Sequence, residues 1–276
     1  MLKRIKLVIC DIDGTLIDDQ RVISERTCDV IRQLHGQGIY FGIASGRPID
    51  ELKRYAGEWN LDFEFDVIIG SNGAELYDGI QNVKNEYFKL RKEWIKEILE
   101  LMSPFESNPI IYIDGQILVK KLDDLVEKSK RSSQKPAKVA ASMEDFYKAE
   151  NAKIMFRVKE DIMPDIEAYL QDHPSDYYKG TKTQTTMMEF MDKRVSKGYA
   201  LEQFSQQAGI PLSEIVAFGD MSNDIDLLSK SGWGVCMANG SEDVKAIASD
   251  ITEYTNNEDG FARYCESKIF SGKGSK

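Results

Sequence analysis

The sequence lacks the features that mark membrane and secreted proteins. No apolar run approaches the roughly 20 residues that cross a bilayer. The basic residues near the amino terminus precede an apolar run that is too short for a signal-peptide core and that ends in acids. The four cysteines are scattered and form no CxxC pair, which is typical of a reducing compartment. We therefore expect a cytoplasmic protein with no membrane partner.

Basic residues are in the minority. The chain has 36 Lys and Arg against 46 Asp and Glu, which gives a formal charge of −10. Such a surface repels polyanions, so we expect no nucleic-acid partner. A small anionic ligand would need a local positive site, such as a metal ion or a few well-placed bases. With 42% hydrophobic residues, the 276-residue chain can bury a core, and its length suits one large or two modest domains. No sequence feature indicates an oligomeric state.

Apolar runs alternate with amphipathic stretches at both ends of the chain. The first part indicates strand, helix, strand, helix and strand, over residues 5–10, 24–38, 39–44, 48–59 and 66–70. The order returns late, with a helix ended by Gly209 and then strands at 214–219, at 232–237 and near Ile251 with helices between them. We expect Ser24 to cap the first helix. Apolar strands in this order are typical of a parallel sheet with helices on both faces.

The middle of the chain follows a different pattern. Strands and helices are mixed there, with helices predicted at 91–102 and 163–171 and strands at 109–113, 115–119, 152–159 and 183–190. A basic stretch at 128–138 is expected to be an exposed loop, and contact with an anionic substrate is the alternative. We therefore predict that residues 82–190 form an inserted α+β domain, and that 1–81 and 191–276 together form the α/β core.

Two acids stand one residue apart at the end of the first strand. They are Asp11 and Asp13, directly before Gly14. Ligands of open parallel sheets bind at the carboxyl ends of strands, and the glycine allows a sharp turn. Two carboxylates left there without a partner would be destabilising, so we expect a cation between them. An Asx cap would need only one acid, and Gly14 comes too early for an EF-hand calcium loop.

Two further segments offer groups that can hold a phosphoryl oxygen. Ser45 and Gly46 follow the second strand and supply a hydroxyl and an approachable backbone amide, although a plain strand-to-helix turn is the alternative. Lys197 stands in the first turn of a predicted helix, where the helix end favours anions. A bound anion would explain a lysine there, and an exposed surface lysine is the alternative.

A second acidic cluster follows the strand at 214–219. Asp220 and Asp224 carry oxygen ligands of the kind that Mg²⁺ prefers, and Asn223 can orient them or touch a substrate. Asp226 is expected to face solvent. Acids that merely cap a helix are the alternative, but they would not explain why both clusters terminate similar strands.

These motifs occur together in one order: DxDGT, SGR, the helix-start lysine and GDxxND. With them the chain resembles the haloacid dehalogenase superfamily, and within it the Cof-type sugar-phosphatase-like hydrolases, over nearly its whole length. The resemblance implies a Rossmann-like parallel sheet core with helices on both faces, and an inserted α+β cap domain that acts as a lid.

The resemblance also implies roles for individual residues. Asp11 would be the nucleophile and Asp13 the general acid/base, while Ser45 and Lys197 would hold the transferring phosphoryl group. The implied Mg²⁺ ligands are Asp11, Asp13 through its carbonyl oxygen, and Asp220, with Asp224 in support. The implied substrate-binding residues are Ser45, Gly46, Arg47, Asn72, Lys197 and Asn223.

The function implied by the resemblance is a Mg²⁺-dependent phosphatase that hydrolyses small phosphorylated metabolites, such as sugar phosphates, through an aspartyl-phosphate. A phosphomutase, which would return the phosphoryl group to a sugar, is one alternative. A phospho-accepting switch module is another, although such modules are much shorter and need no cap. A non-catalytic binder would not need every one of these chemical groups.

Overall fold

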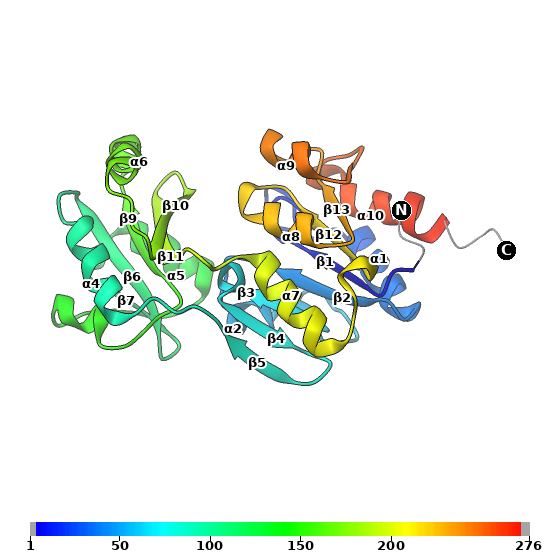
Figure 1. The fold of residues 1–276 in the computed structure, drawn as a ribbon, viewed down its shortest axis with the longest axis horizontal. Coiled ribbons are helices and arrows are strands. Elements are labelled where there is room, and N and C mark those ends of the chain that lie inside the picture. The colour runs from blue at the N-terminus through cyan, green and yellow to red at the C-terminus, as the bar shows by residue number, and fades with distance from the viewer. Residues whose placement is uncertain (1–3, 272–276) are drawn as a thin grey trace. The chain divides into compact units, whose positions relative to one another are not determined.

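The computed structural model describes residues 4–271, and the chain divides into two compact units (Figure 1). One unit comprises the chain up to Tyr87 and from Ser196 onward, and the other comprises Phe88–Val195. The sequence prediction placed the inserted segment at 82–190. The predicted segment therefore begins and ends a few residues before the unit seen in the structure. The early boundary differs because Val83–Glu86 pairs as a strand with Glu75–Asp78 and extends the sheet of the first unit.

A single sheet forms the centre of the first unit, with strand order β14-β13-β12-β1-β2-β3-β4-β5. The strands are β1 (Leu7–Cys10), β2 (Tyr40–Ala44), β3 (Val67–Gly70), β4 (Glu75–Asp78), β5 (Val83–Glu86), β12 (Ile215–Gly219), β13 (Trp233–Cys236) and β14 (Asp250–Ile251). Neighbours from β14 to β3 pair in parallel, as predicted. By contrast, β4 and β5 are antiparallel. The turn Ser71–Gly73 is too short for a parallel return, which needs a crossover of a dozen or more residues.

Helices cover both faces of this sheet. They are α1 (Glu25–Gly36), α2 (Ile49–Leu52), α3 (Tyr55–Glu58), α7 (Lys197–Ala208), α8 (Ile225–Lys230), α9 (Glu242–Ile247) and α10 (Gly260–Tyr264). On β1, Val8 and Cys10 belong to the apolar cluster that includes α1 and α10, whereas Leu7 and Ile9 belong to the cluster that includes α7. Because side chains alternate along a strand, both faces are buried, which confirms the predicted α/β fold.

Helix ends test the local predictions. Ser24 caps α1, because its side chain accepts a hydrogen bond from the amide of Thr27, and Gly209 ends α7 with a left-handed φ of 66°.

The single helix predicted at 48–59 is wrong, since α2 and α3 are separate. Both short helices direct apolar residues, Leu52 from α2 and Tyr55 from α3, into the same core, so packing rather than helix propensity decides this segment.

The second unit has its own sheet, with strand order β10-β11-β9-β6-β7-β8. The strands are β6 (Ser107–Ile113), β7 (Gln116–Val119), β8 (Ala137–Val139), β9 (Ile154–Val158), β10 (Tyr178–Gln184) and β11 (Met187–Asp192). Its helices are α4 (Lys92–Leu101), α5 (Asp124–Ser133) and α6 (Met163–Asp172). Ile95 of α4 and Ile166 of α6 pack in one apolar cluster and Val126 of α5 in another, so the unit has its own α+β core.

Two local predictions for this unit are wrong. The basic stretch at 128–138 is not a loop, because α5 continues to Ser133 and is followed by β8. Val126, Ser129 and Ser133 recur at helical spacing and are buried, which explains the helix. The stretch at 183–190 is not one strand, because the exposed edge strand β10 ends at Gln184 and the buried β11 begins at Met187. No helix within residues 4–271 is long and apolar enough to cross a membrane.

Candidate active site

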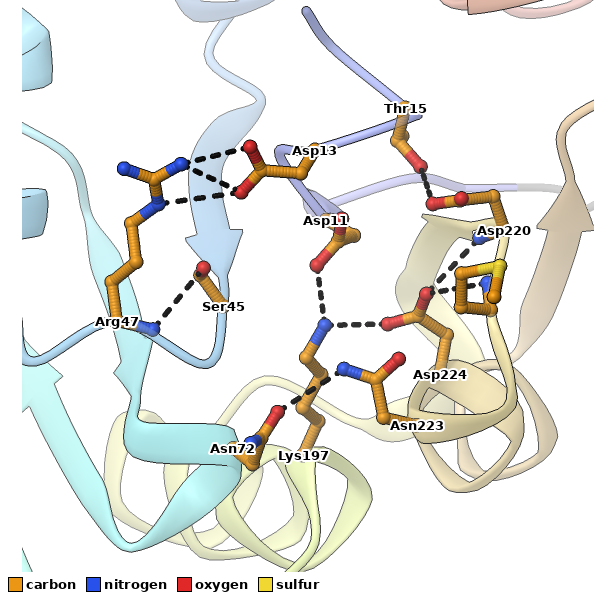
Figure 2. Close-up of polar contacts among 11 residues, drawn as sticks. Asp11, Asp13, Thr15, Ser45, Arg47, Asn72, Lys197, Asp220, Asn223 and Asp224 are labelled. Atoms are coloured by element: carbon orange, nitrogen blue, oxygen red, sulfur yellow. Dashed lines mark hydrogen bonds and ion pairs between the residues drawn. The ribbon is translucent and has the colours of Figure 1, made fainter. Parts of the chain in front are cut away.

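The predicted site residues meet at the carboxyl ends of three neighbouring strands (Figure 2). Asp11 follows β1, Ser45 follows β2 and Asp220 follows β12. The parallel register aligns these ends, since the last residue of β1 pairs with the second-last residue of β2 and of β12. Lys197 reaches the same place from the first turn of α7. Residues that are far apart in the sequence therefore form one polar cluster.

A fully buried lysine lies at the centre of the cluster. The Nζ atom of Lys197 donates to Oδ1 of Asp11 and, at 2.6 Å, to Oδ1 of Asp224, and its side chain has no exposed surface. Figure 2 shows the ammonium group between the two carboxylates. This burial excludes the alternative of an exposed surface lysine.

Burial and mutual repulsion change the acidity of the buried carboxyl groups. Burial raises the pKa of Asp11 well above its usual value, Lys197 lowers it only in part, and repulsion from Asp224 and Asp220 adds to the rise. Burial, with repulsion from Asp224, raises the pKa of Asp220 to about 7. Burial alone would lower the pKa of Lys197, but Asp11 and Asp224 outweigh it, so the pKa is raised and the ammonium stays charged. Asp11 and Asp224 thus share a single ammonium, with the Asp220 carboxyl group nearby.

The donor set fits a small divalent cation. One carboxylate oxygen from each of Asp11, Asp220 and Asp224 lies within 4.8 Å of the others, and all three residues are buried. Hard oxygen donors of this kind suit Mg²⁺, and a cation would relieve the repulsion that raises the pKa of Asp220. Oδ2 of Asp224, however, accepts the amides of Asp220 at 3.0 Å and Met221 at 3.2 Å, while its Oδ1 accepts Lys197. Asp224 therefore holds the lysine and the loop rather than offering an unused oxygen.

Gly14 lets the first acidic loop approach the second. Its φ is +84°, the left-handed region that glycine tolerates best, as its place after the acids predicted. A Cβ atom at this position would lie 2.9 Å from Cγ of Asp220. The next residue, Thr15, donates from Oγ1 to Oδ1 of Asp220 at 2.9 Å. Both residues of the loop therefore fix the position of the Asp220 carboxylate.

Asp13 forms an ion pair with Arg47. The guanidinium donates from Nη2 to both carboxylate oxygens of Asp13, at 2.8 and 2.9 Å, and from Nε at 3.3 Å. The Asp13 side chain is 48% exposed, whereas Arg47 is mostly buried. Asp13 thus stands at the rim of the cluster, in contact with a residue predicted to bind substrate.

Ser45, Gly46, Asn72 and Asn223 form the side of the site nearest β3. The amide of Asn72 donates to the carbonyl of Ser45 at 3.0 Å, and Nδ2 of Asn223 donates to Oδ1 of Asn72 at 3.1 Å. A Cβ atom on Gly46 would lie 3.3 Å from the side-chain Nδ2 atom of Asn72. Asn72 itself has a left-handed φ of 56° in the turn after β3. The predicted substrate-binding residues are therefore brought together, in a turn whose backbone is strained.

Two site residues received no role from the sequence. Thr15 binds Asp220, and its place directly after DxDG in the DxDGT motif was the signal that could have identified it. Asp226, expected to face solvent, is 39% exposed and also accepts a hydrogen bond from Ser196, the N-cap residue of α7. No local signal predicts that contact, since the two residues are 30 positions apart.

Comparison with known proteins places these residues in a family context. The family model of haloacid dehalogenase-like hydrolases matches residues 8–264. The chain is 27% identical to 5-amino-6-(5-phospho-D-ribitylamino)uracil phosphatase YitU of Bacillus subtilis, over 94% of this chain and 95% of that protein. The crystal structure of a haloacid dehalogenase-like hydrolase from Bacteroides thetaiotaomicron superposes with a TM-score of 0.84 at 25% identity, covering 96% of this chain and 99% of that one. A subclass IIB sugar phosphatase shares the fold, with a TM-score of 0.78 at 23% identity and coverage of 95% and 98%.

Proposed function

This chain belongs to the haloacid dehalogenase-like hydrolase family and is a phosphoric monoester hydrolase, and we propose that it cleaves small phosphorylated metabolites in a Mg²⁺-dependent reaction through an aspartyl-phosphate on Asp11. The observation that carries the proposal is the buried cluster of Lys197, Asp11 and Asp224 beside Asp220. Burying a lysine with two acids costs free energy, and buried ionisable groups with strongly shifted pKa values commonly belong to functional sites.

In the first step a carboxylate oxygen of Asp11 attacks phosphorus in line with the ester oxygen. The new P–O bond forms as the ester P–O bond breaks, and the leaving oxygen takes a proton from Asp13. Lys197, which contacts Asp11, would neutralise charge on the transferring group, and the buried Ser45 would hold one of its oxygens. The products of this step are the free alcohol and the phosphorylated Asp11.

In the second step water attacks the phosphorus of the aspartyl-phosphate. Asp13 takes a proton from that water, and the bond between phosphorus and the Asp11 oxygen breaks, which restores the carboxylate and releases inorganic phosphate. Bound Mg²⁺, held by Asp11, Asp220 and the carbonyl oxygen of Asp13, would supply positive charge that offsets the repulsion between the carboxylate and a phosphate dianion. Asp224 supports this set by holding Lys197.

Arg47 has a second role in this scheme. In the structure it binds Asp13, so it holds the acid/base group at the rim before a substrate arrives. Transfer of Arg47 to the substrate would release Asp13 toward the leaving oxygen. The unit Phe88–Val195 is the cap domain of the proposal, and it would exclude water during the first step.

The named relatives support the choice of substrate class. YitU is named as a phosphatase of a phosphorylated ribitylaminouracil. We propose phosphate esters of sugars, sugar alcohols or similar polyols as substrates of this chain.

The deciding experiment is phosphate release from a panel of sugar, polyol, nucleotide and cofactor phosphates, with Mg²⁺ or with EDTA. Wild type should release phosphate only with Mg²⁺, Asp11→Asn should release none, and the control Asp19→Asn, on the same loop but exposed, should match wild type. Isomerised product without free phosphate would identify a mutase instead. Stable phosphate on Asp11 without turnover would identify a switch module, and either result would overturn the proposal.

A further inference from the structure

One loop beside the active site has no role in the proposed chemistry. It is the β13–α9 loop, residues 237–241, which follows β13 and precedes α9. Its asparagine, Asn239, is exposed, and none of its residues belongs to the four motifs that define the site. The contacts of this loop nevertheless reach both of the acidic loops.

The first contact is with the loop that follows the nucleophile. Nδ2 of Asn239 donates to the carbonyl oxygen of Gly14 at 2.8 Å. Gly14 has the left-handed φ of +84°, and its carbonyl belongs to the peptide unit next to the one that carries the Asp13 carbonyl. The two peptide units share the Gly14 Cα, so the hydrogen bond that holds the Gly14 carbonyl also anchors the end of the Asp13–Gly14 peptide unit. Asn239 therefore limits how far the Asp13–Gly14 backbone can move.

The second contact is with the loop that carries Asp220. The amide of Ser241 donates to the Asp220 carbonyl at 2.9 Å, and the Ser241 hydroxyl approaches the same oxygen at 3.2 Å. In α9, Asp243 accepts a hydrogen bond from Ser222 at 2.6 Å. The β13–α9 loop is thus bonded to the backbone of both loops that would supply metal ligands.

A third contact fixes Asn239 itself. Its Oδ1 accepts the amide of Asn256 at 3.0 Å, and Nδ2 of Asn256 donates to the carbonyl of Ile17 at 2.9 Å. Asn256 is buried. The two asparagines therefore join the carboxyl-terminal segment to residues 14–17, more than 200 positions away in the sequence.

We propose that Asn239 is a positioning residue, which sets the spacing between the Asp13–Gly14 backbone and Asp220 and thereby tunes the affinity of the site for Mg²⁺. The inference rests on the proposed function, since it assumes that these oxygens bind the metal. Groups that orient metal ligands commonly change metal affinity by about 10- to 100-fold when removed.

The test measures Mg²⁺ binding directly, by titration calorimetry of the metal-free protein without substrate. Asn239→Ala should weaken Mg²⁺ binding by about tenfold or more. In turnover assays the Mg²⁺ concentration at half-maximal rate should rise by a similar factor, while KM for the substrate at saturating Mg²⁺ changes little. Asn257→Ala is the matched control, because the Asn257 side chain hydrogen-bonds the exposed Asp19, which follows Gly14 and Ile17 in the chain. Its Mg²⁺ affinity should stay within twofold of wild type.

Asn239→Asp separates positioning from a merely structural role. The carboxylate keeps an acceptor for the Asn256 amide but cannot donate to Gly14, and its negative charge by itself would strengthen cation binding. Weaker Mg²⁺ binding in this variant, with a melting temperature like that of wild type in EDTA, supports the proposal. Mg²⁺ affinity within twofold of wild type in Asn239→Ala, or tighter binding in Asn239→Asp, would overturn it. If the wild type releases no phosphate, the proposed function is wrong. The Mg²⁺ affinities of the wild type and the Asn239 variants can still be compared, because calorimetry needs no turnover.

Discussion

Gly14 and Asp220 are packed so closely that no side chain fits between them. A Cβ atom on Gly14 would lie 2.9 Å from Cγ of Asp220, and its backbone is left-handed at φ +84°. The absence of a side chain on this glycine therefore decides how near the two acidic loops come, and with it the geometry of the oxygen cluster.

Gly14→Ala should abolish most activity. The strained φ costs about 1–2 kcal/mol for a residue with a side chain, and the new methyl group would push Asp220 from its place. Gly38→Ala is a matched control, because Gly38 has φ +73° but a Cβ there meets nothing within 4 Å among residues 4–271. We expect a similar loss of thermal stability from the strain in both variants, but loss of Mg²⁺-dependent phosphate release only in Gly14→Ala. Equal activity in the two would show that the close approach is unimportant.

Lys197→Met should destabilise the protein and remove activity. Without the ammonium, Asp11 and Asp224 are left buried and uncompensated, and breaking a buried ion pair in this way typically costs about 3–5 kcal/mol. Lys182→Met, which removes an exposed partner of Glu167, should cost less than about 1 kcal/mol. Urea unfolding in EDTA measures both. A Lys197→Met protein as stable as the Lys182 variant would mean that the two acids protonate at no cost.

Asp13→Asn should slow turnover by about 10²- to 10⁴-fold, the usual contribution of a general acid or base. The carbonyl of residue 13 is unchanged, so Mg²⁺ binding should stay near the wild-type value. Single-turnover and steady-state rates of phosphate release, together with calorimetric Mg²⁺ titration, measure these effects. Asp19→Asn is the control on the same loop. Turnover by Asp13→Asn at the wild-type rate would refute the acid/base role.

Arg47→Met should separate binding from chemistry. The variant loses the partner of Asp13 and the proposed contact with substrate, so we expect KM to rise while the protein stays folded, because the ion pair lies at the half-exposed rim. Arg54→Met, which removes a partly buried ion pair with Glu58 of α3, is the control. An unchanged KM would show that Arg47 remains with Asp13 throughout the reaction.

The pKa of Asp220, raised to about 7 by burial and by Asp224, predicts a pH dependence. The folded metal-free protein binds this proton more tightly than the unfolded chain does, so its stability should fall as the pH rises from about 4 to about 7. Mg²⁺ competes with the proton, so Mg²⁺ should stabilise the protein more at pH 8 than at pH 5. Urea unfolding with and without Mg²⁺ at the two pH values tests this, and Asp220→Asn should lose most of the difference. Equal stabilisation by Mg²⁺ at both values would contradict it.

Much of the fold could be predicted from the sequence, because many of its features depend on short-range interactions. Apolar strands, the Ser24 cap and the Gly209 stop were predicted because each depends on neighbouring residues alone. The predictions at 48–59, 128–138 and 183–190 were wrong because packing decided them. Side-chain burial in the folded core decides where α2 ends and α3 begins, and where β10 gives way to β11. Helix α5 forms because the domain around it buries Val126 and Ser129.

The sequence by itself determined which chemical groups are available: paired acids after β1 and β12, a hydroxyl after β2 and a lysine at a helix start. The predicted parallel sheet and the resemblance carried by the order of the motifs indicated that these groups belong to one site. Only the tertiary structure decided their partners, because each partner comes from a distant part of the chain. Lys197 is shared by Asp11 and Asp224, Arg47 holds Asp13, and Asn239 holds Gly14. These pairings depend on where the folded backbone places each side chain, which no local pattern encodes.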